Sequence, residues 1–201
     1  MPNGDEFSVK IEHDMGFFLD PNVYAPILKI NDDAAVVVKL SLIHENFLTV
    51  FIENMRKDGT EKYVKSDKYF HPKLCTCVAL GLPTSIANCL SYLNAIRNKY
   101  AHEISYQLSD EDVQKFDVLL KTITMDDINH FGFCKPNFIE PLLNQGADAI
   151  KFMTDLPYST PLSQRRRSKL VAQAFVLSNF CSFYFLNAKQ ESGSLKLSYG
   201  H

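Results

Sequence analysis

Apolar residues recur every three or four positions along one long early stretch of the chain. The apolar positions of this stretch are Val36, Leu40, Ile43, Phe47, Val50, Phe51 and Met55. Such spacing is typical of an amphipathic α-helix. Asp32 or Asp33 can cap its first turn, and Lys57-Asp58-Gly59 ends the pattern. We therefore expect a long helix here. The first thirty residues, interrupted by two prolines, predict a short helix or an irregular packing segment.

Two further helices are expected after residues 59–70, which are polar and charged and are interpreted as a loop. Pro72 suits the first turn of the first of them, and Gly81 suits its carboxyl end. Thr84 can cap the second. Its apolar positions are Ile86, Leu90, Leu93, Ile96 and Tyr100.

The next helix carries several start signals at once. Ser109 followed by Asp112 resembles a capping box, and Leu108 and Val113 are placed to form a hydrophobic staple. The apolar stripe continues through Phe116, Leu119, Leu120 and Ile123. A break is then predicted over residues 124–136.

The last third of the chain predicts two more helices. Asn137 can cap one that reaches about Leu156, and Thr160-Pro161 can cap another that reaches about Lys189, with a polar tail behind it. No segment alternates convincingly enough to be a strand, so the fold class is all-α. We expect an N-terminal segment (1–31), a helical core (32–123), a helical extension packed on that core (124–190) and a tail (191–201).

Residues 170–186 of the last predicted helix form a mostly apolar run that could be taken for a membrane span. Seventeen residues lie at the short end of the range that spans a bilayer, and Gln173, Ser178, Asn179 and Ser182 interrupt the run. A helix that is apolar around most of its circumference is typical of a core or a subunit interface. We therefore expect no membrane partner.

Charge and cysteine content limit the classes of function. The 201 residues include 21 basic and 23 acidic side chains, a formal net charge of −2, so the chain is not a polycation that coats nucleic acid. Five scattered cysteines make a poor disulfide framework and predict buried thiols in a reducing compartment. They also give no zinc-finger spacing, so no metal is expected. Residues 1–14 lack the features of a signal peptide, and we expect a cytoplasmic protein.

The block Leu93-Asn94-Ala95-Ile96-Arg97-Asn98-Lys99-Tyr100-Ala101-His102-Glu103 carries the candidate chemistry. Arg97 and His102 lie about 140° apart around a regular helix, whereas Asn98 and His102 lie about 40° apart. Fraying of the helix end would let His102 approach Arg97, and so would a second copy of the helix across a two-fold axis. An exposed arginine and a helix-terminal histidine that interacts with the helix dipole is the alternative.

Three segments together resemble a family pattern. Residues Phe70–Leu74, Ala79–Leu82 and Leu93–His102 are similar to the "K-L…A-L-G-L…L-x-x-I-R-N-x-x-A-H" pattern of the HEPN superfamily (higher eukaryotes and prokaryotes nucleotide-binding), as found in its mannitol-repressor and abortive-infection members. The resemblance covers about residues 32–123. It implies an up-and-down helical bundle, to which the C-terminal helices predicted above are added. It also implies a homodimer in which paired motifs face one cleft.

The resemblance further implies a metal-independent endoribonuclease without a cofactor, active as a toxin or an anti-phage effector. His102 would act as base or acid, because imidazole changes its charge near neutral pH. The guanidinium of Arg97 would bind the phosphate through two parallel hydrogen bonds and stabilise its charge. Asn98 would bond a phosphate oxygen or orient His102. The expected products carry a 2′,3′-cyclic phosphate and a 5′-OH, and an antitoxin or regulatory protein is a possible partner.

Other residues enter as weaker candidates. Glu45 on the first long helix is a candidate catalytic group, with a solvated helix face as the alternative. Lys99 and the basic run Arg165-Arg166-Arg167 are candidate RNA contacts, with a solvated first helical turn as the alternative for the run. Ile104 stands where members silenced by nucleotide transfer carry a tyrosine, which argues against that control.

Two other functions are left open. One is a non-catalytic HEPN domain that acts as a transcriptional regulator or as a protein- or nucleotide-binding module. The other is an all-α scaffold that matches the motif by accident.

Overall fold

The computed structural model describes residues 15–128, 157 and 159–191, with side chains as far as residue 189. Within these residues there are eight α-helices and no strand, which confirms the predicted all-α class. The elements are α1 (Gly16–Leu19), α2 (Pro21–Tyr24), the 3₁₀ turn η1 (Ile27–Lys29), α3 (Asp33–Met55), α4 (Phe70–Ala79), α5 (Thr84–His102), α6 (Asp110–Leu120), α7 (Met125–Ile128) and α9 (Leu162–Glu191). The predicted helix over residues 137–156 lies outside the described residues, as does Cys134.

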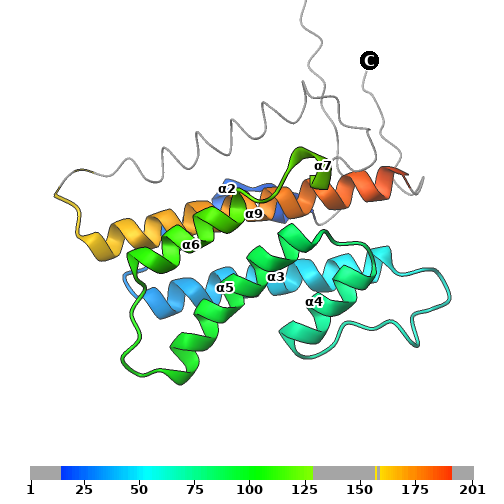
Figure 1. Cartoon of the computed structure of the whole chain (residues 1–201), viewed down its shortest axis with the longest axis horizontal. Coiled ribbons are helices and arrows are strands. Elements are labelled where there is room, and N and C mark those ends of the chain that lie inside the picture. The colour runs from blue at the N-terminus through cyan, green and yellow to red at the C-terminus, as the bar shows by residue number, and fades with distance from the viewer. Residues whose placement is uncertain (1–14, 129–156, 158, 192–201) are drawn as a thin grey trace, which may run out of the picture.

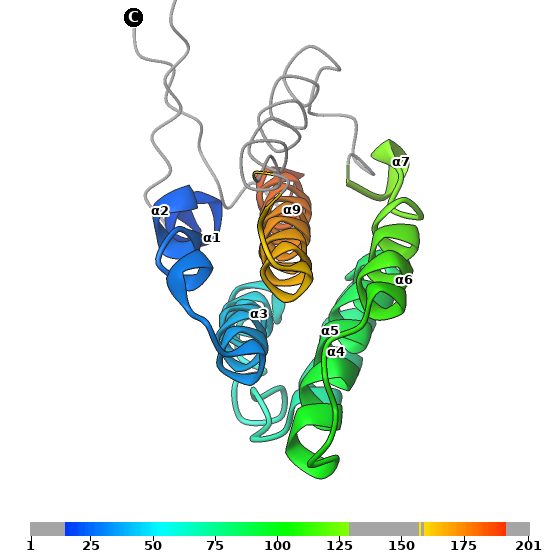
Figure 2. The same ribbon diagram turned by 90° about the vertical axis from the view of Figure 1, so that its left-hand side faces the viewer.

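The helices form three layers around two long central ones. Helices α3 and α9 lie one above the other in the middle, with α4, α5 and α6 on one side and α1, α2 and η1 on the other (Figures 1 and 2). Helix α3 contacts α4, α5 and α9, and α9 also contacts α1, α6 and α7. The predicted helical core and the predicted C-terminal extension therefore share one hydrophobic core.

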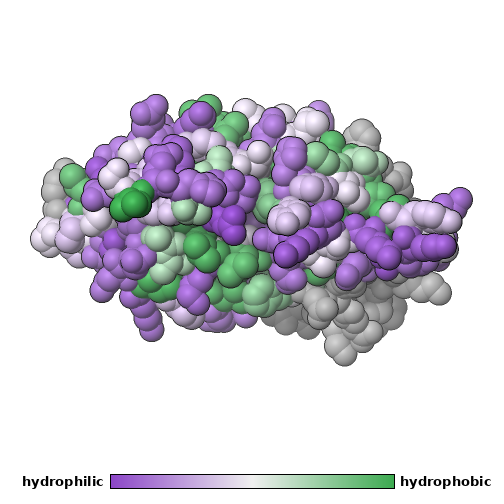
Figure 3. Space-filling view, turned by 90° about the horizontal axis from the view of Figure 1, so that it is seen from below, coloured by the Kyte–Doolittle hydropathy of each residue, from purple (hydrophilic) through white to green (hydrophobic). Residues whose placement is uncertain are grey.

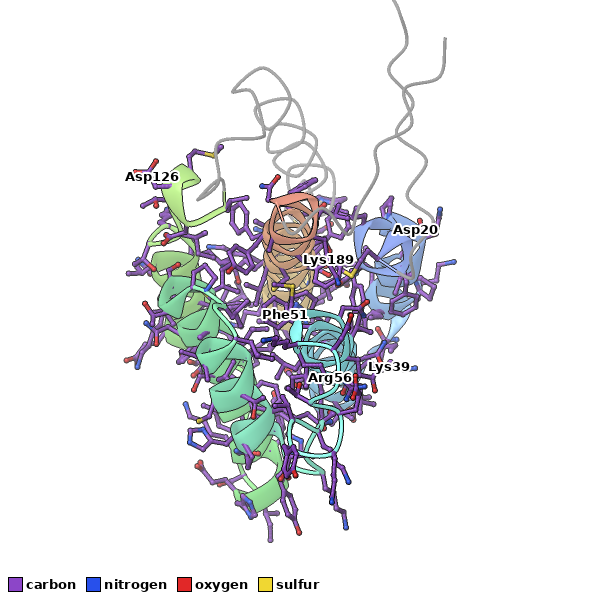
Figure 4. The ribbon with its side chains drawn as sticks, turned by 90° about the vertical axis from the view of Figure 1, so that its right-hand side faces the viewer. Asp20, Lys39, Phe51, Arg56, Asp126 and Lys189 are labelled. Atoms are coloured by element: carbon purple, nitrogen blue, oxygen red, sulfur yellow. The ribbon has the colours of Figure 1, made fainter. Side chains whose placement is uncertain are left out.

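Aromatic side chains fill the space between α3 and α9. Phe51 lies between the two helices (Figure 4), with its ring centroid 6.1 Å from those of both Tyr184 and Phe185. Nearer the start of the chain, the Phe18 ring meets Phe47 edge-on at 5.8 Å. Burying a side chain of this size stabilises the fold by roughly 1.5–3 kcal/mol. The apolar stripe that predicts α3 is thus the face that packs on α9.

Polar side chains on α9 hold the elements around it. Ser178 donates to the Phe18 carbonyl at 2.9 Å, which ties α9 to α1. Gln173 donates to the Val113 carbonyl of α6 at 3.0 Å. Farther along α9, Asn187 donates to the carbonyl of Ile128 and Tyr184 donates to that of Gly81. Ser182 donates within α9, to the carbonyl of Ser178. The polar residues that interrupt the apolar run are therefore internal donors, because a buried donor needs an acceptor.

Two helices are long and apolar enough to cross a bilayer by length and composition, namely Asp33–Met55 and Leu162–Lys189. Their most apolar windows have mean hydropathies of 1.6 and 1.3. Half of the first window and 83% of the second are buried against the rest of the chain. Core helices of soluble proteins share these properties.

Several predicted helix ends are confirmed. Asp32 caps α3 by accepting a bond from the Ala35 N–H at 2.6 Å. Ser109 and Asp112 form the expected capping box at the start of α6, and Leu108 and Val113 are both buried, as a staple requires. Local signals of this kind need only residues that are close in sequence.

Other ends differ from the prediction. The N-cap of α5 is Pro83, which has no side-chain donor or acceptor, and Thr84 is the first helical residue instead of the cap. Helix α6 ends at Leu120, three residues before the end of the predicted stripe. The predicted break contains the single turn of α7, because Thr124 and Asp127 exchange hydrogen bonds at its start.

The cysteines follow the prediction with one exception. Four free cysteines lie in the described part of the chain, and three of them, Cys77, Cys89 and Cys181, are buried. Burial raises the pKa of both Cys77 and Cys89 to about 12, so these thiols are unreactive. Cys75 is exposed, so the prediction is wrong there: it lies on the outer face of α4.

Candidate functional site

Helix α5 presents the candidate motif at its carboxyl end. Ile86, Leu90, Leu93 and Ile96 are buried and fix the orientation of the helix against α3. Arg97 follows directly and is exposed, and His102 is the last helical residue and is also exposed. The helix ends there because Glu103 is extended, with its N–H bonded to the Lys99 carbonyl. The motif is therefore open to solvent.

The structure brings two of the three motif residues together. Arg97 donates from Nη1 to Oδ1 of Asn98 at 3.1 Å. The helix does not fray before His102, so the angle of about 140° between Arg97 and His102 persists. Within the described part of the chain, His102 makes no side-chain hydrogen bond or ion pair. A single chain thus joins Arg97 to Asn98 and leaves His102 apart.

Lys99, a predicted RNA contact, points toward α6. Its Nζ lies 2.9 Å from Oδ1 of Asp112 and 5.0 Å from the centroid of the Tyr106 ring. Asp112 also accepts bonds from Ser109 and from the Tyr106 hydroxyl. Burial opposes ionisation of Asp112, but the bonds from Ser109, Lys99 and Tyr106 outweigh it and lower its pKa to about 2. The charge of Lys99 is therefore held at the α5–α6 junction.

Two tyrosines hold the turn that follows His102. The Tyr100 hydroxyl accepts a bond from the Leu108 N–H at 2.8 Å, and its ring meets that of Tyr106 at 4.6 Å. The turn from Glu103 to Ser109 is thereby fixed at both ends. Neither tyrosine was a predicted site residue. The sequence signal that could have identified them is that one tyrosine lies before the predicted end of the helix and the other shortly after it.

Glu45 lies in an ion pair between helices α3 and α4. Its Oε1 is 2.8 Å from Nζ of Lys73, and both side chains are largely buried. The structure shows no hydrogen bond from Glu45 to Arg97 or His102. Lys73 lies in the first segment of the family resemblance, and its pairing with Glu45 joins that segment to α3.

The basic run at the start of α9 is engaged within the chain. Arg166 binds both carboxylate oxygens of Asp110, at 2.9 and 2.7 Å. Arg167 pairs with Asp33 at 2.8 Å, and Arg165 donates to the carbonyls of Thr160 and Pro157. These contacts tie α9 to α3 and α6. RNA would have to displace them to bind here.

Neither a metal cluster nor a cavity adds to the site. In residues 15–128 and 159–189, no three histidine, cysteine or acidic side chains are placed to hold a metal ion. A cavity of about 550 Å³ lies between α6 and α9, and its lining includes Asp117, Lys121, Lys169 and Gln173. None of the predicted catalytic residues lines it.

Comparisons with protein-family models, with curated proteins and with solved structures gave no match to this chain.

Proposed function

We propose that this chain is a metal-independent endoribonuclease of the HEPN type, a toxin or anti-phage effector that cleaves single-stranded RNA. The observation that carries the proposal is the Arg-Asn-x-x-x-His block at the exposed end of α5, where Arg97 and Asn98 are in contact. Arginine followed by an amide offers a cluster of donors for phosphate oxygens.

Cleavage of RNA by this route needs a general base, a general acid and a group that stabilises the negative charge developing on the phosphate. His102 takes the proton of a ribose 2′-OH, and the 2′-oxygen attacks the adjacent phosphorus. The bond from phosphorus to the 5′-oxygen breaks, and that oxygen takes a proton from water. Arg97 stabilises the charge that develops on the phosphate oxygens. The products are a 2′,3′-cyclic phosphate and a 5′-OH.

A second copy of the chain would complete this site. Since Arg97 and His102 point apart in one chain, two α5 helices that meet across a two-fold axis would pool Arg97 of one copy with His102 of the other. Mixing the Arg97→Ala and His102→Ala proteins would then restore part of the activity. Two inactive variants that stay inactive when mixed, while each still forms a dimer, would rule out this arrangement.

The direct test is cleavage of single-stranded RNA in the presence of EDTA. We expect Arg97→Ala and His102→Ala each to abolish cleavage while circular dichroism shows an unchanged helical content. His71→Ala removes another exposed histidine, on α4, and serves as the matched control with full activity. If both motif variants cleave as well as the parent, the assigned site is wrong.

A non-catalytic HEPN domain is the second candidate, and one observation favours it. Within the described residues, His102 lacks the hydrogen-bonded partner that usually orients a catalytic base, and Glu45 is engaged with Lys73. Such a domain would act as a transcriptional regulator or as a binding module. Induced expression discriminates the two: growth arrest that depends on Arg97 and His102 supports the enzyme, and unimpaired growth supports the binding module.

A further inference from the structure

Two tyrosines stand out on the connection between α3 and α4, which we call the basic–tyrosine segment (Arg56–Tyr69). The Tyr63 side chain is 81% exposed and the Tyr69 side chain 65% exposed. Aromatic rings usually bury most of their surface, and their exposure in one place marks a contact surface. Neither ring lies near the cavity between α6 and α9.

Basic residues are interleaved with these rings. The segment contains five basic and three acidic residues, a local net charge of +2 in a chain whose total is −2. Nζ of Lys62 lies 5.7 Å from the centroid of the Tyr63 ring, and Nζ of Lys68 lies 5.8 Å from that of Tyr69. Each ring therefore carries a cation beside it.

The backbone of the segment is held in place. Arg56 (Figure 4) donates to the Val64 carbonyl at 3.2 Å, and Ser66 donates to the hydroxyl of Thr49 on α3 at 3.1 Å. The Val64 side chain packs against the core. Tyr63 is therefore exposed next to a residue that the core holds in place.

We propose that the basic–tyrosine segment binds single-stranded nucleic acid. Tyr63 and Tyr69 stack on unpaired bases, and Lys62, Lys65 and Lys68 contact the phosphates. Stacked aromatic rings together with a positive groove are how proteins hold single strands without reading their sequence. The proposal deepens the function above, because it states how the RNA substrate is held, and it rests on that function for the identity of the nucleic acid.

The position of the basic–tyrosine segment would let one nucleic-acid strand contact both this segment and the motif with Arg97 and His102. Helix α3 is 23 residues long, or about 34 Å. The segment follows its carboxyl end, while the end of α5 lies near its start, where Tyr100 approaches Asp33. The two sites lie toward opposite ends of the lower side of the molecule (Figure 1). A single strand extends between about 3.4 Å per nucleotide when stacked and about twice that when stretched, so about five to ten nucleotides separate the two sites.

A membrane fits this surface less well than a nucleic acid does. Membrane-surface segments bury a continuous apolar face, whereas hydrophilic residues predominate at the end of the molecule that carries this segment, at the right of Figure 3.

Fluorescence anisotropy with labelled oligodeoxythymidine tests the proposal, since this probe has no 2′-OH and cannot be cleaved by the proposed chemistry. We expect Tyr63→Ala and Tyr69→Ala each to weaken binding about tenfold, equivalent to about 1.4 kcal/mol. Tyr63→Phe and Tyr69→Phe keep the rings and should bind like the parent. Leu162→Ala, at a 65% exposed apolar residue on α9, is the control for loss of surface.

Salt and length add two independent readouts. Changing Lys62, Lys65 and Lys68 together to glutamine should reduce the slope of log Kd against log salt by about 2. Arg97→Ala should weaken binding of a 15-nucleotide probe and leave a 4-nucleotide probe unaffected, because the short probe cannot reach both sites.

The outcomes separate this inference from the proposed function. If the parent binds the probe and the tyrosine variants do not, the segment is a nucleic-acid surface even when no RNA is cleaved. If the parent cleaves RNA but the tyrosine variants bind the probe as tightly as the parent, the inference is wrong and the function stands. Failure of the parent to bind any probe, or binding to phosphatidylserine vesicles in its place, also overturns the inference.

Discussion

His44 is a buried histidine of α3 that directly precedes Glu45. It is 1% exposed, and its Nδ1 lies 2.8 Å from the Leu40 carbonyl. Burial is the largest influence on this group and lowers the pKa of His44 below its ordinary value of 6.5. The folded state therefore holds the neutral ring.

This burial makes stability depend on pH. Because the folded pKa is depressed, the unfolded chain takes up a proton first, and stability is complete above pH 6.5 and falls below it. Between pH 7.5 and 5.5 we expect the free energy of unfolding to drop through His44 alone. Urea denaturation at the two pH values measures the drop.

His44→Leu should remove most of that pH dependence, whatever it does to stability at pH 7.5. His71→Leu, at an exposed position on α4, is the control and should leave the dependence intact. The same pH dependence in the parent and in His44→Leu would show that other groups cause it.

At the scale of elements, the α5–α6 junction is held by one carboxylate. Asp112 is 5% exposed and collects the bonds from Ser109, Lys99 and Tyr106. Its pKa of about 2 lies below the ordinary 3.8, so its contribution to stability is complete above pH 4 and is lost as the pH falls toward 2. We expect Asp112→Asn to cost about 2 kcal/mol at pH 7, measured by urea denaturation.

Asp110→Asn is the matched control for this junction. Asp110 also lies in the first turn of α6, but its side chain is 73% exposed, so water and salt screen its pair with Arg166 and the loss should be much smaller than for Asp112. Equal losses for both variants would mean that the helix dipole, which both carboxylates share, accounts for the effect.

The same junction shows which structural features a sequence can predict. The capping box of Ser109 and Asp112 was predicted because its partners are three residues apart, as was the stripe that buries Phe47 and Phe51. The bond between Lys99 and Asp112 was not, since it depends on how α5 packs against α6. The acidic partners of Arg166 and Arg167 lie 56 and 134 residues away in sequence, so the sequence pattern gave no sign that these arginines form ion pairs.

The candidate site was predictable to a similar extent. The helix that carries Arg97 and His102 and its exposed end followed from periodicity. The pairing of Glu45 with Lys73 joins two helices and did not. The segment with Tyr63 and Tyr69 was set aside as a polar loop, although its alternation of lysine and tyrosine was visible in the sequence.

At the scale of the whole molecule, α9, which was expected to pack on a helical core of residues 32–123 or to lie at a subunit interface, is part of that core. It contributes Leu170, Val171, Ala174, Phe175, Leu177, Cys181, Tyr184 and Phe185 to the same cluster as α3 and α5. Its polar side chains bond to carbonyls of α1, α6 and α7 and of the turn at Gly81. Without α9, one long apolar face of α3 would meet water.

We therefore expect a fragment that ends at residue 128 to lose cooperative folding, although it keeps the whole family-like stretch. At roughly 25 cal/mol per Å² of buried apolar surface, the loss of one central helix exceeds the 5–15 kcal/mol that holds a typical domain together. Thermal melting followed by circular dichroism should show no cooperative transition for the fragment. Adding a separate peptide of residues 157–201 should restore one if α9 acts through packing alone. A fragment that melts cooperatively by itself would show instead that α3 to α6 form an independent domain to which α9 was added.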